Sequence, residues 1–156
     1  MTTPRRLELT DADATEALGR ALAAAVPGRR FAVALTGPLG AGKSTLARSM
    51  LRALGVAGAI PSPTYTIVEP YEANGRSLYH VDLYRLGGAD EVEVLGLTDV
   101  APDALMLIEW PELAEGYIEF DLAVGLDHAA PGRVASLRAI TAAGERVLDR
   151  VVERRP

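Results

Sequence analysis

Residues 37–44 read GPLGAGKS, a pattern that places strict demands on the structure around it. It matches G-x-x-x-x-G-K-[ST], the phosphate-binding loop, which joins the end of a buried strand to the start of a helix. The sequence predicts both the strand before this loop and the helix after it. The preceding FAVALTG is a nearly all-apolar run, as expected of a strand buried on both faces. The following KSTLARSMLRALG places its leucines and Met50 on one side of a helix that ends at Gly55.

The chemistry of phosphate binding explains the spacing within this loop. Glycines let successive backbone N–H groups turn inward and form a nest for anionic oxygens, to which the following helix adds its positive end. Lys43 supplies a mobile charge for the β- and γ-phosphates, and the Ser44 hydroxyl can coordinate Mg²⁺. A glycine-rich turn without a ligand is the alternative, but it does not require the flanking strand and helix. We therefore predict a nucleotide-binding loop.

A phosphate loop needs an acidic residue near the metal, and the sequence offers two candidates. Glu109 ends the apolar run ALMLIE, so its carboxylate is expected at the carboxyl edge of a buried strand, where ligands bind in open α/β sheets. Asp82 lies in LYHVDLYRL, on a second predicted strand. The alternatives are a solvated strand end for Glu109 and a salt bridge, for example with Arg85, for Asp82. His80 alternates with Asp82 and is more readily interpreted as a packed or hydrogen-bonded histidine than as a base.

The segment IPSPTYTIVEPY, residues 60–71, is rich in proline and hydroxyl groups. Its prolines exclude a helix and favour extended backbone at the preceding residues. It follows the predicted phosphate-loop helix, where many proteins of this class keep a segment that senses the γ-phosphate. The Thr64 hydroxyl could then reach Mg²⁺ or the terminal phosphate. A proline-stiffened entry to a strand explains the residues equally well, so both interpretations stay open.

The remaining pattern predicts an α/β fold of the P-loop NTPase type, with a central mixed, mostly parallel sheet flanked by helices. Asn74-Gly75 within residues 65–86 predicts a β-hairpin. A first helix is expected from Thr10, as its N-cap, to Pro27. Further elements are expected as a short helix over 89–97, strands over 103–110, 117–126 and 133–141, and a closing helix over 144–155. We predict a single domain, residues 1–156.

Composition excludes several classes of protein. The chain has no cysteine, which rules out disulfides and thiolate metal sites. Its net charge of −5 argues against broad, sequence-independent binding of nucleic acid, although it allows docking on a protein that holds nucleic acid. The N-terminal segment lacks the apolar core of a secretory signal, and no run is long enough to span a membrane. A cytoplasmic protein without a membrane partner is expected.

Four segments together resemble one family. TGPLGAGKSTLAR, SPTYTIVEPYE, YHVDLYRL and LIEWPE, in this order and spacing, are similar to TsaE, the YjeE-type P-loop ATPases. SPTYT and EWPE are more specific to this family than the phosphate loop is. The resemblance implies a slow, Mg²⁺-dependent ATPase for N6-threonylcarbamoyl modification of adenosine 37 in tRNAs that read ANN codons. It also implies TsaB- and TsaD-type transferase subunits as partners, with tRNA engaged only indirectly.

The same resemblance implies a role for individual residues. Ser44 and Glu109 would hold Mg²⁺, Thr64 would be the switch-like threonine, and Asp82 would assist the catalytic water or the metal. Trp110 would lie at the nucleotide or at a partner surface, with a core aromatic as the alternative. The implied nucleotide contacts are Asp11, Gly37, Gly40, Ala41, Gly42, Lys43, Ser44, Thr45, Trp110 and Arg133, and the implied catalytic residues are Lys43, Thr64, Asp82 and Glu109.

One departure and three alternatives remain. Pro38 stands where the family often has an acidic residue, which leaves any role of that carboxylate in doubt here. A small-molecule kinase of the P-loop class would need an arginine-bearing lid, and the loop pair Arg29-Arg30 precedes the first core strand instead. A GTPase would need an [NT]-K-x-D segment, but Lys43 is the sole lysine. A binding module that uses nucleotide structurally would bind without releasing phosphate.

Overall fold

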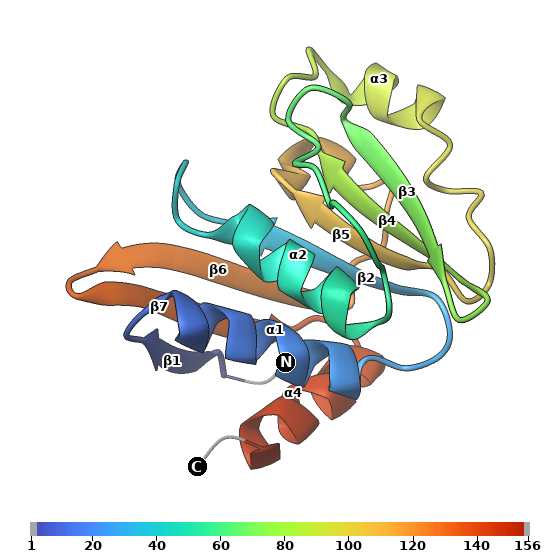
Figure 1. Ribbon diagram of the computed structural model, residues 1–156. Coiled ribbons are helices and arrows are strands. Elements are labelled where there is room, and N and C mark those ends of the chain that lie inside the picture. Colours follow the sequence, from blue (N-terminus) through green and yellow to red (C-terminus); the bar gives the residue numbers. More distant parts are fainter. Residues whose placement is uncertain (1–2, 155–156) are drawn as a thin grey trace.

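The computed structural model describes residues 3–154, and at its centre is a seven-stranded sheet in the order β1-β7-β6-β2-β5-β4-β3 (Figure 1). The three adjoining pairs β6–β2, β2–β5 and β5–β4 are parallel. The pairs β1–β7, β7–β6 and β4–β3 are antiparallel. The strands are β1 (Arg5–Leu9), β2 (Phe31–Thr36), β3 (Val68–Ala73), β4 (Arg76–Asp82), β5 (Leu105–Glu109), β6 (Leu122–Ala129) and β7 (Gly132–Ala139).

The predicted mixed sheet is confirmed, and its parallel part is confined to the four central strands. Antiparallel pairs lie at both margins because hairpin-like connections join β3 to β4 and β6 to β7. The Asn74-Gly75 turn has positive φ at both residues, as a two-residue hairpin requires, and it joins β3 to β4 as predicted.

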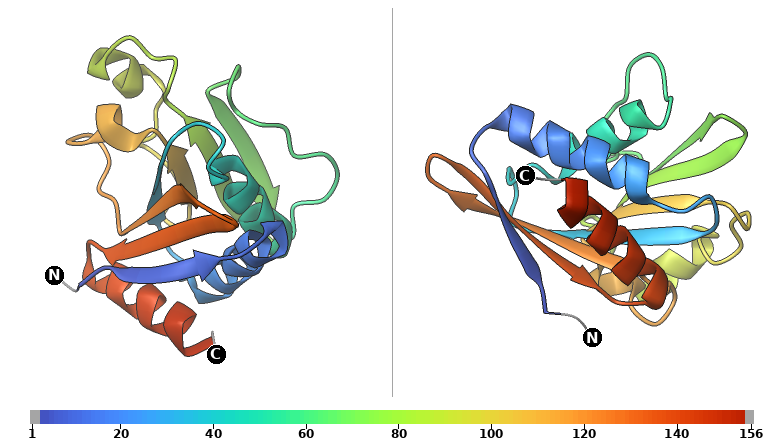
Figure 2. Two further views of the ribbon diagram at one scale, coloured as in Figure 1. Left: turned by 90° about the vertical axis from the view of Figure 1, so that its left-hand side faces the viewer. Right: turned by 90° about the horizontal axis from the view of Figure 1, so that it is seen from below.

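Helices cover both faces of the sheet (Figures 1 and 2). One face carries α1 (Ala12–Ala25), α2 (Lys43–Ala53) and α4 (Ala142–Arg154). The other carries α3 (Ala89–Val94) and the 3₁₀ turn η1 (Pro111–Ala114). Within residues 3–154, no helix is long and apolar enough to cross a membrane.

The all-apolar composition of β2 follows from its place between two hydrophobic cores. Phe31, Val33 and Leu35 pack into the core beneath α1, α2 and α4. Ala32 and Ala34 alternate with them and pack into the smaller core beneath α3 and η1. A strand buried on both faces carries few polar side chains, so β2 is a continuous apolar run from residue 31 to residue 35.

Several local features differ from the sequence-based expectations, among them the strand expected over 117–126, which begins at Leu122. The α1 N-cap is Asp11 rather than Thr10, because the Asp11 carboxylate accepts a hydrogen bond from the Ala14 N–H at 2.8 Å. The strand β1 was not predicted. The strand expected to begin near residue 65 begins at Val68, since Ile67 has a φ of 68° that interrupts extended backbone.

Asp121, just before β6, forms hydrogen bonds both to β2 and to the residue that precedes α4. Its carboxylate accepts hydrogen bonds from the Ala32 N–H at 2.9 Å and the Thr141 hydroxyl at 2.7 Å. Its carbonyl oxygen lies so close to α4 that a Cβ on Gly144 would approach it to 1.8 Å. Only glycine allows this contact between backbone and helix.

We therefore expect Gly144→Ala to destabilise the protein, although alanine normally favours a helix over glycine. Relieving the clash requires α4 to shift, at a cost of about 2–3 kcal/mol in the free energy of unfolding. Chemical denaturation would measure the change. Asp149→Ala, at an exposed position of the same helix, is the matched control and should stay within about 0.5 kcal/mol of the parent protein. Equal stability of Gly144→Ala and Asp149→Ala would contradict the assigned packing.

Candidate functional site

The predicted phosphate loop joins β2 to α2, as its motif requires. Gly42 is the N-cap of α2 and has a φ of 105°. Gly37 has a φ of 135°, and a Cβ at this position would lie 2.1 Å from the carbonyl oxygen of Leu126. Glycine at position 37 is therefore required both by the backbone conformation and by the close approach of β6.

Lys43, the first residue of α2, is 5% exposed. Its ammonium group donates hydrogen bonds to the carbonyl oxygens of Gly37 and, at 3.3 Å, Pro38. The Lys43 Nζ atom also lies 3.8 Å from the centre of the Trp110 ring, within the range of a cation–π interaction. Burial lowers the pKa of Lys43 from its usual value, and the carboxylate of Glu109 acts most strongly in the opposite direction.

Glu109 ends β5 and is buried, yet its carboxylate has polar partners. The Ser44 hydroxyl donates a hydrogen bond to Glu109 Oε2 at 2.9 Å. The Nε2 atom of His80, a fully buried side chain on β4, lies 2.6 Å from the same oxygen. Because a carboxylate oxygen accepts hydrogen bonds, Nε2 is the ring nitrogen that donates to Glu109. The other ring nitrogen, Nδ1, has no hydrogen-bond partner among the described residues. His80 and Ser44 thus fix the orientation of this carboxylate.

Asp82 ends β4 directly beside Glu109 in the parallel β4–β5 register. It is buried, and its Oδ1 accepts a hydrogen bond from the Tyr84 N–H at 2.9 Å. Burial raises the pKa of the Asp82 carboxyl, and this hydrogen bond works against the rise. The salt bridge between Asp82 and Arg85, which the sequence left open, does not occur within the described part of the chain.

These residues surround one cavity of about 280 Å³ at the carboxyl ends of β2, β4 and β5. The segment 60–71 reaches this cavity through Thr64, whose hydroxyl lies 2.9 Å from that of Ser62. Trp110 also reaches it, and its ring lies 4.8 Å from that of Tyr84. The lining residues are Leu39, Gly40, Gly42, Lys43, Ser44, Thr45, Thr64, Asp82, Glu109 and Trp110.

A second cavity, of about 190 Å³, lies on the other side of the phosphate loop. Its wall includes Asp11 at the start of α1 and Arg133 on β7. The Arg133 guanidinium donates hydrogen bonds to the carbonyl oxygens of Ala41 at 3.1 Å and Gly40 at 3.2 Å, and so ties β7 to the loop. Thr45 lines both cavities, which places them side by side.

The fold thus brings the predicted site residues to one region. All except Asp11, Gly37, Ala41 and Arg133 line the first cavity. Asp11, Ala41 and Arg133 line the second, and Gly37 lies beneath the loop against β6. His80 is the packed, hydrogen-bonded histidine that the sequence favoured, and its partner is Glu109. Its alternation with Asp82 places both side chains on one face of the strand.

The donor atoms suit a hard divalent cation that also binds phosphate. Within residues 3–154, no cluster of three or more His, Asp or Glu side chains could hold a metal by itself. Mg²⁺ is usually held by one or two carboxylates together with substrate phosphates and waters. A hydroxyl at Ser44 beside a carboxylate at Glu109, at the start of a phosphate-loop helix, fits that pattern.

Sheet order, phosphate-loop placement and edge carboxylates define the class of this fold as α/β, of the P-loop NTPase type. The chain belongs to the TsaE family: the family described as threonylcarbamoyl adenosine biosynthesis protein TsaE matches residues 9–134. The resemblance noted from the sequence is therefore confirmed.

Curated relatives agree with this assignment. The tRNA threonylcarbamoyladenosine biosynthesis protein TsaE of Haemophilus influenzae is 43% identical over 118 residues, which cover 74% of this chain and 75% of the relative. The protein of the same name from Streptomyces coelicolor is 42% identical over 116 residues, covering 72% and 78%. The crystal structure of Bacillus subtilis YdiB shares the fold, with a TM-score of 0.77, 23% identity, and coverage of 98% of this chain and 97% of that one.

Proposed function

We propose that this chain is a Mg²⁺-dependent ATPase. In this proposal it acts with a TsaB- and TsaD-type transferase complex in the N6-threonylcarbamoylation of adenosine 37 in tRNAs that read ANN codons. The observation that carries the ATPase proposal is the shared cavity, in which Lys43, Ser44, Thr64, Asp82 and Glu109 meet at the phosphate loop. Membership of the TsaE family supports the role in tRNA modification.

The residues of the loop would bind and orient the triphosphate. Backbone N–H groups of the loop and of the first turn of α2 face the phosphate oxygens of a ligand at a helix N-terminus. The Lys43 ammonium would exchange its bonds to the loop carbonyls for the β- and γ-phosphate oxygens. The second cavity, beside Asp11 and Arg133, would take the nucleoside part of the nucleotide.

Ser44 and Glu109 are the residues that would hold Mg²⁺, which supplies charge neutralisation to the β- and γ-phosphates when bound. His80 keeps the Glu109 carboxylate in place through its hydrogen bond. Asp82 and Thr64, which line the same cavity, would orient the attacking water. As water adds to the γ-phosphorus, the bond to the bridging β-oxygen breaks, which gives ADP and inorganic phosphate.

The cavity contains one cation among its lining side chains, Lys43. Arginine fingers stabilise the transition state of phosphoryl transfer and typically raise rates by about 10³–10⁵. Because the described lining residues include no arginine, we expect slow hydrolysis by the chain alone and faster hydrolysis in the partner complex.

Phosphate release tests this proposal. Purified protein would be assayed with ATP and Mg²⁺, alone and with the TsaB- and TsaD-type subunits, beside a Lys43→Ala variant. We expect release above the variant in both cases and a higher rate with the partners. No release above the variant in either condition would refute the ATPase and favour a nucleotide-binding module.

Thr64 gives a sharper prediction, because in this proposal its hydroxyl acts only on a γ-phosphate or its metal. We expect Thr64→Ala to bind ADP with nearly unchanged affinity and to hydrolyse ATP about tenfold or more slowly. Thr64→Ser, which keeps the hydroxyl, is the matched control and should retain most of the activity. An equal loss of ADP affinity in Thr64→Ala would show that Thr64 is structural instead.

A further inference from the structure

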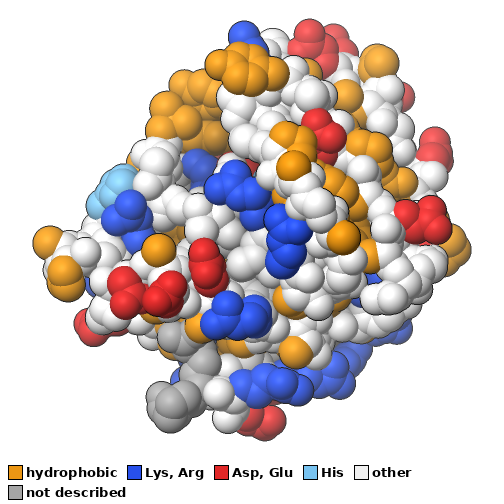
Figure 3. Space-filling model, in the orientation of Figure 1, with side chains coloured by type: hydrophobic (Ala, Val, Ile, Leu, Met, Phe, Trp, Pro, Cys, Tyr) orange, Lys and Arg blue, Asp and Glu red, His pale blue; other side chains and the backbone are white. Residues whose placement is uncertain are grey.

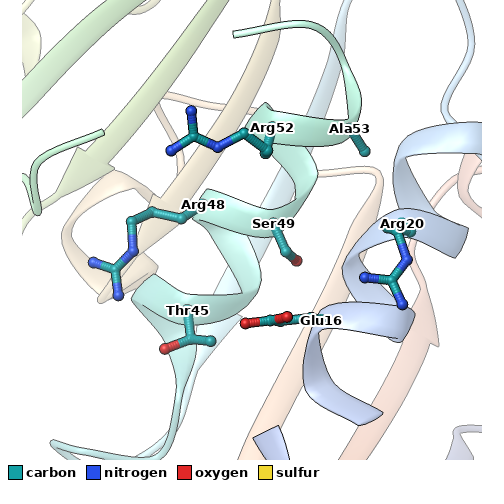
Figure 4. Close-up of a pocket in the computed structure, with 7 residues that line it drawn as sticks. All are labelled: Glu16, Arg20, Thr45, Arg48, Ser49, Arg52 and Ala53. Atoms are coloured by element: carbon teal, nitrogen blue, oxygen red, sulfur yellow. The ribbon is translucent and has the colours of Figure 1, made fainter. Parts of the chain in front are cut away.

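A third cavity lies in a groove between α1 and α2 and shares Thr45 with the first cavity. Its volume is about 440 Å³, larger than either cavity at the phosphate loop. Glu16 and Ser49 lie between the two helices, with Arg20 on the α1 side and Arg48 and Arg52 on the α2 side (Figure 4). We call this feature the α1–α2 groove.

Two of its three arginines donate no hydrogen bond within the described residues. Arg52 donates hydrogen bonds to the carbonyl oxygens of Gly58, at 2.5 Å, and Val56, at 3.4 Å, so it stabilises the chain that leaves α2. In the part of the chain that the structure describes, Arg20 and Arg48 make no hydrogen bond or ion pair. Glu16 lies beside them but more than 4.0 Å from either guanidinium, outside ion-pair distance. The Arg20 guanidinium lies on the α1 side of the groove, and that of Arg48 lies at its rim, on the side of α2 away from α1 (Figure 4).

The charge of the groove opposes that of the whole molecule. The chain carries a net charge of −5, whereas the groove combines three arginines with one glutamate. On the face that shows α1 and α2 in front of the sheet, basic side chains gather in the middle of the surface (Figure 3). A local positive field of this kind attracts an anionic group and steers its approach.

We propose that the α1–α2 groove is a docking site for an Asp- or Glu-bearing segment of a protein partner. Guanidinium groups pair with carboxylates through two parallel hydrogen bonds, which gives both affinity and orientation. Glu16 can accept hydrogen bonds from backbone N–H groups of a bound peptide, and a sugar–phosphate backbone has no such N–H groups. The negative net charge also disfavours a polyanion such as RNA at long range.

The groove shares a wall with the candidate nucleotide site. Thr45 lines the groove and both cavities at the phosphate loop, and α2 begins at Lys43. A segment bound to Arg48 would therefore contact the helix whose first turn binds phosphate. This inference rests on the proposed function in one respect, that the TsaB- and TsaD-type complex is the partner of this chain.

The test uses charge reversal in the full-length protein. The double variant Arg20→Glu/Arg48→Glu removes the two unpaired guanidiniums. Arg5→Glu/Arg138→Glu is the matched control, because it changes net charge equally at two exposed arginines outside the groove, on β1 and β7. Affinity for the TsaB- and TsaD-type complex would be measured by biolayer interferometry at low and moderate salt. Phosphate release would be measured separately, with and without the complex.

We expect the groove variant to lose at least about tenfold in affinity, with a weaker salt dependence, while its release of phosphate without partners stays at the parental rate. The control should keep parental affinity. Parental affinity in the groove variant would overturn the inference. The inference would also be overturned if tRNA alone bound the parent and bound the groove variant more weakly, while the protein complex bound both with the same affinity. If the groove variant loses affinity as expected but the parent protein releases no phosphate, the ATPase proposal is refuted and the docking site in the groove is supported.

Discussion

Replacing Lys43 with alanine is expected to reduce ATP hydrolysis to the background of the assay and to weaken ATP binding by at least about tenfold. Among the described residues that line the first cavity, Lys43 is the only cation, so its loss leaves the β- and γ-phosphates without a charged side-chain partner there. ATP affinity would be measured by calorimetry and hydrolysis by phosphate release.

A Lys43→Met variant separates charge from packing. Methionine keeps most of the length and the apolar stem of the side chain but removes the ammonium group that lies over the Trp110 ring. We expect it to fold like the parent, as judged by thermal denaturation, and to be as inactive as the alanine variant. Hydrolysis within threefold of the parent in either variant would show that Lys43 does not act on the phosphates.

Glu109→Gln is the second change with a large expected effect. The amide keeps the shape of the side chain and can still accept the hydrogen bonds from Ser44 and His80, so the fold should be preserved. It loses the charge that a Mg²⁺ ion requires. We expect phosphate release to fall about a hundredfold, with a higher Mg²⁺ concentration needed for half-maximal rate, as a magnesium titration would show.

The control for Glu109→Gln is the same substitution at another glutamate of the chain. Glu112→Gln makes the same chemical change at an exposed residue of η1, outside the lining of the cavity. It should leave both the rate and the magnesium requirement close to those of the parent. If Glu109→Gln and Glu112→Gln had equal effects, general electrostatics would explain the loss and a role of Glu109 toward Mg²⁺ would be refuted.

The parts of the structure predicted from sequence are those that local pattern determines. The phosphate loop needs a strand, a turn and a helix in succession, and all three lie within residues 31–53. The Asn74-Gly75 hairpin is likewise local. Glu109 could be placed at a sheet edge because the apolar run before it ends abruptly.

The parts not predicted depend on contacts between distant segments. The strand β1 has the sequence RRLEL, too polar to indicate burial, and is held in place by pairing with β7. His80 meets Glu109 only because β4 and β5 are neighbours in a parallel register. Arg133, which only the family resemblance implied, reaches the loop from 92 residues away in sequence. Periodicity alone contains no information on such pairings.

The most direct test of the central claim, that the phosphate-loop cavity binds ATP with Mg²⁺, is the fluorescence of Trp110. It is the only tryptophan of the chain and lies against Lys43, so a phosphate that draws the ammonium away changes its surroundings. We predict a saturable change in indole emission on titration with ATP and Mg²⁺, which is lost in Lys43→Ala. Unchanged emission at millimolar ATP, or an equal change in that variant, would contradict the assigned site.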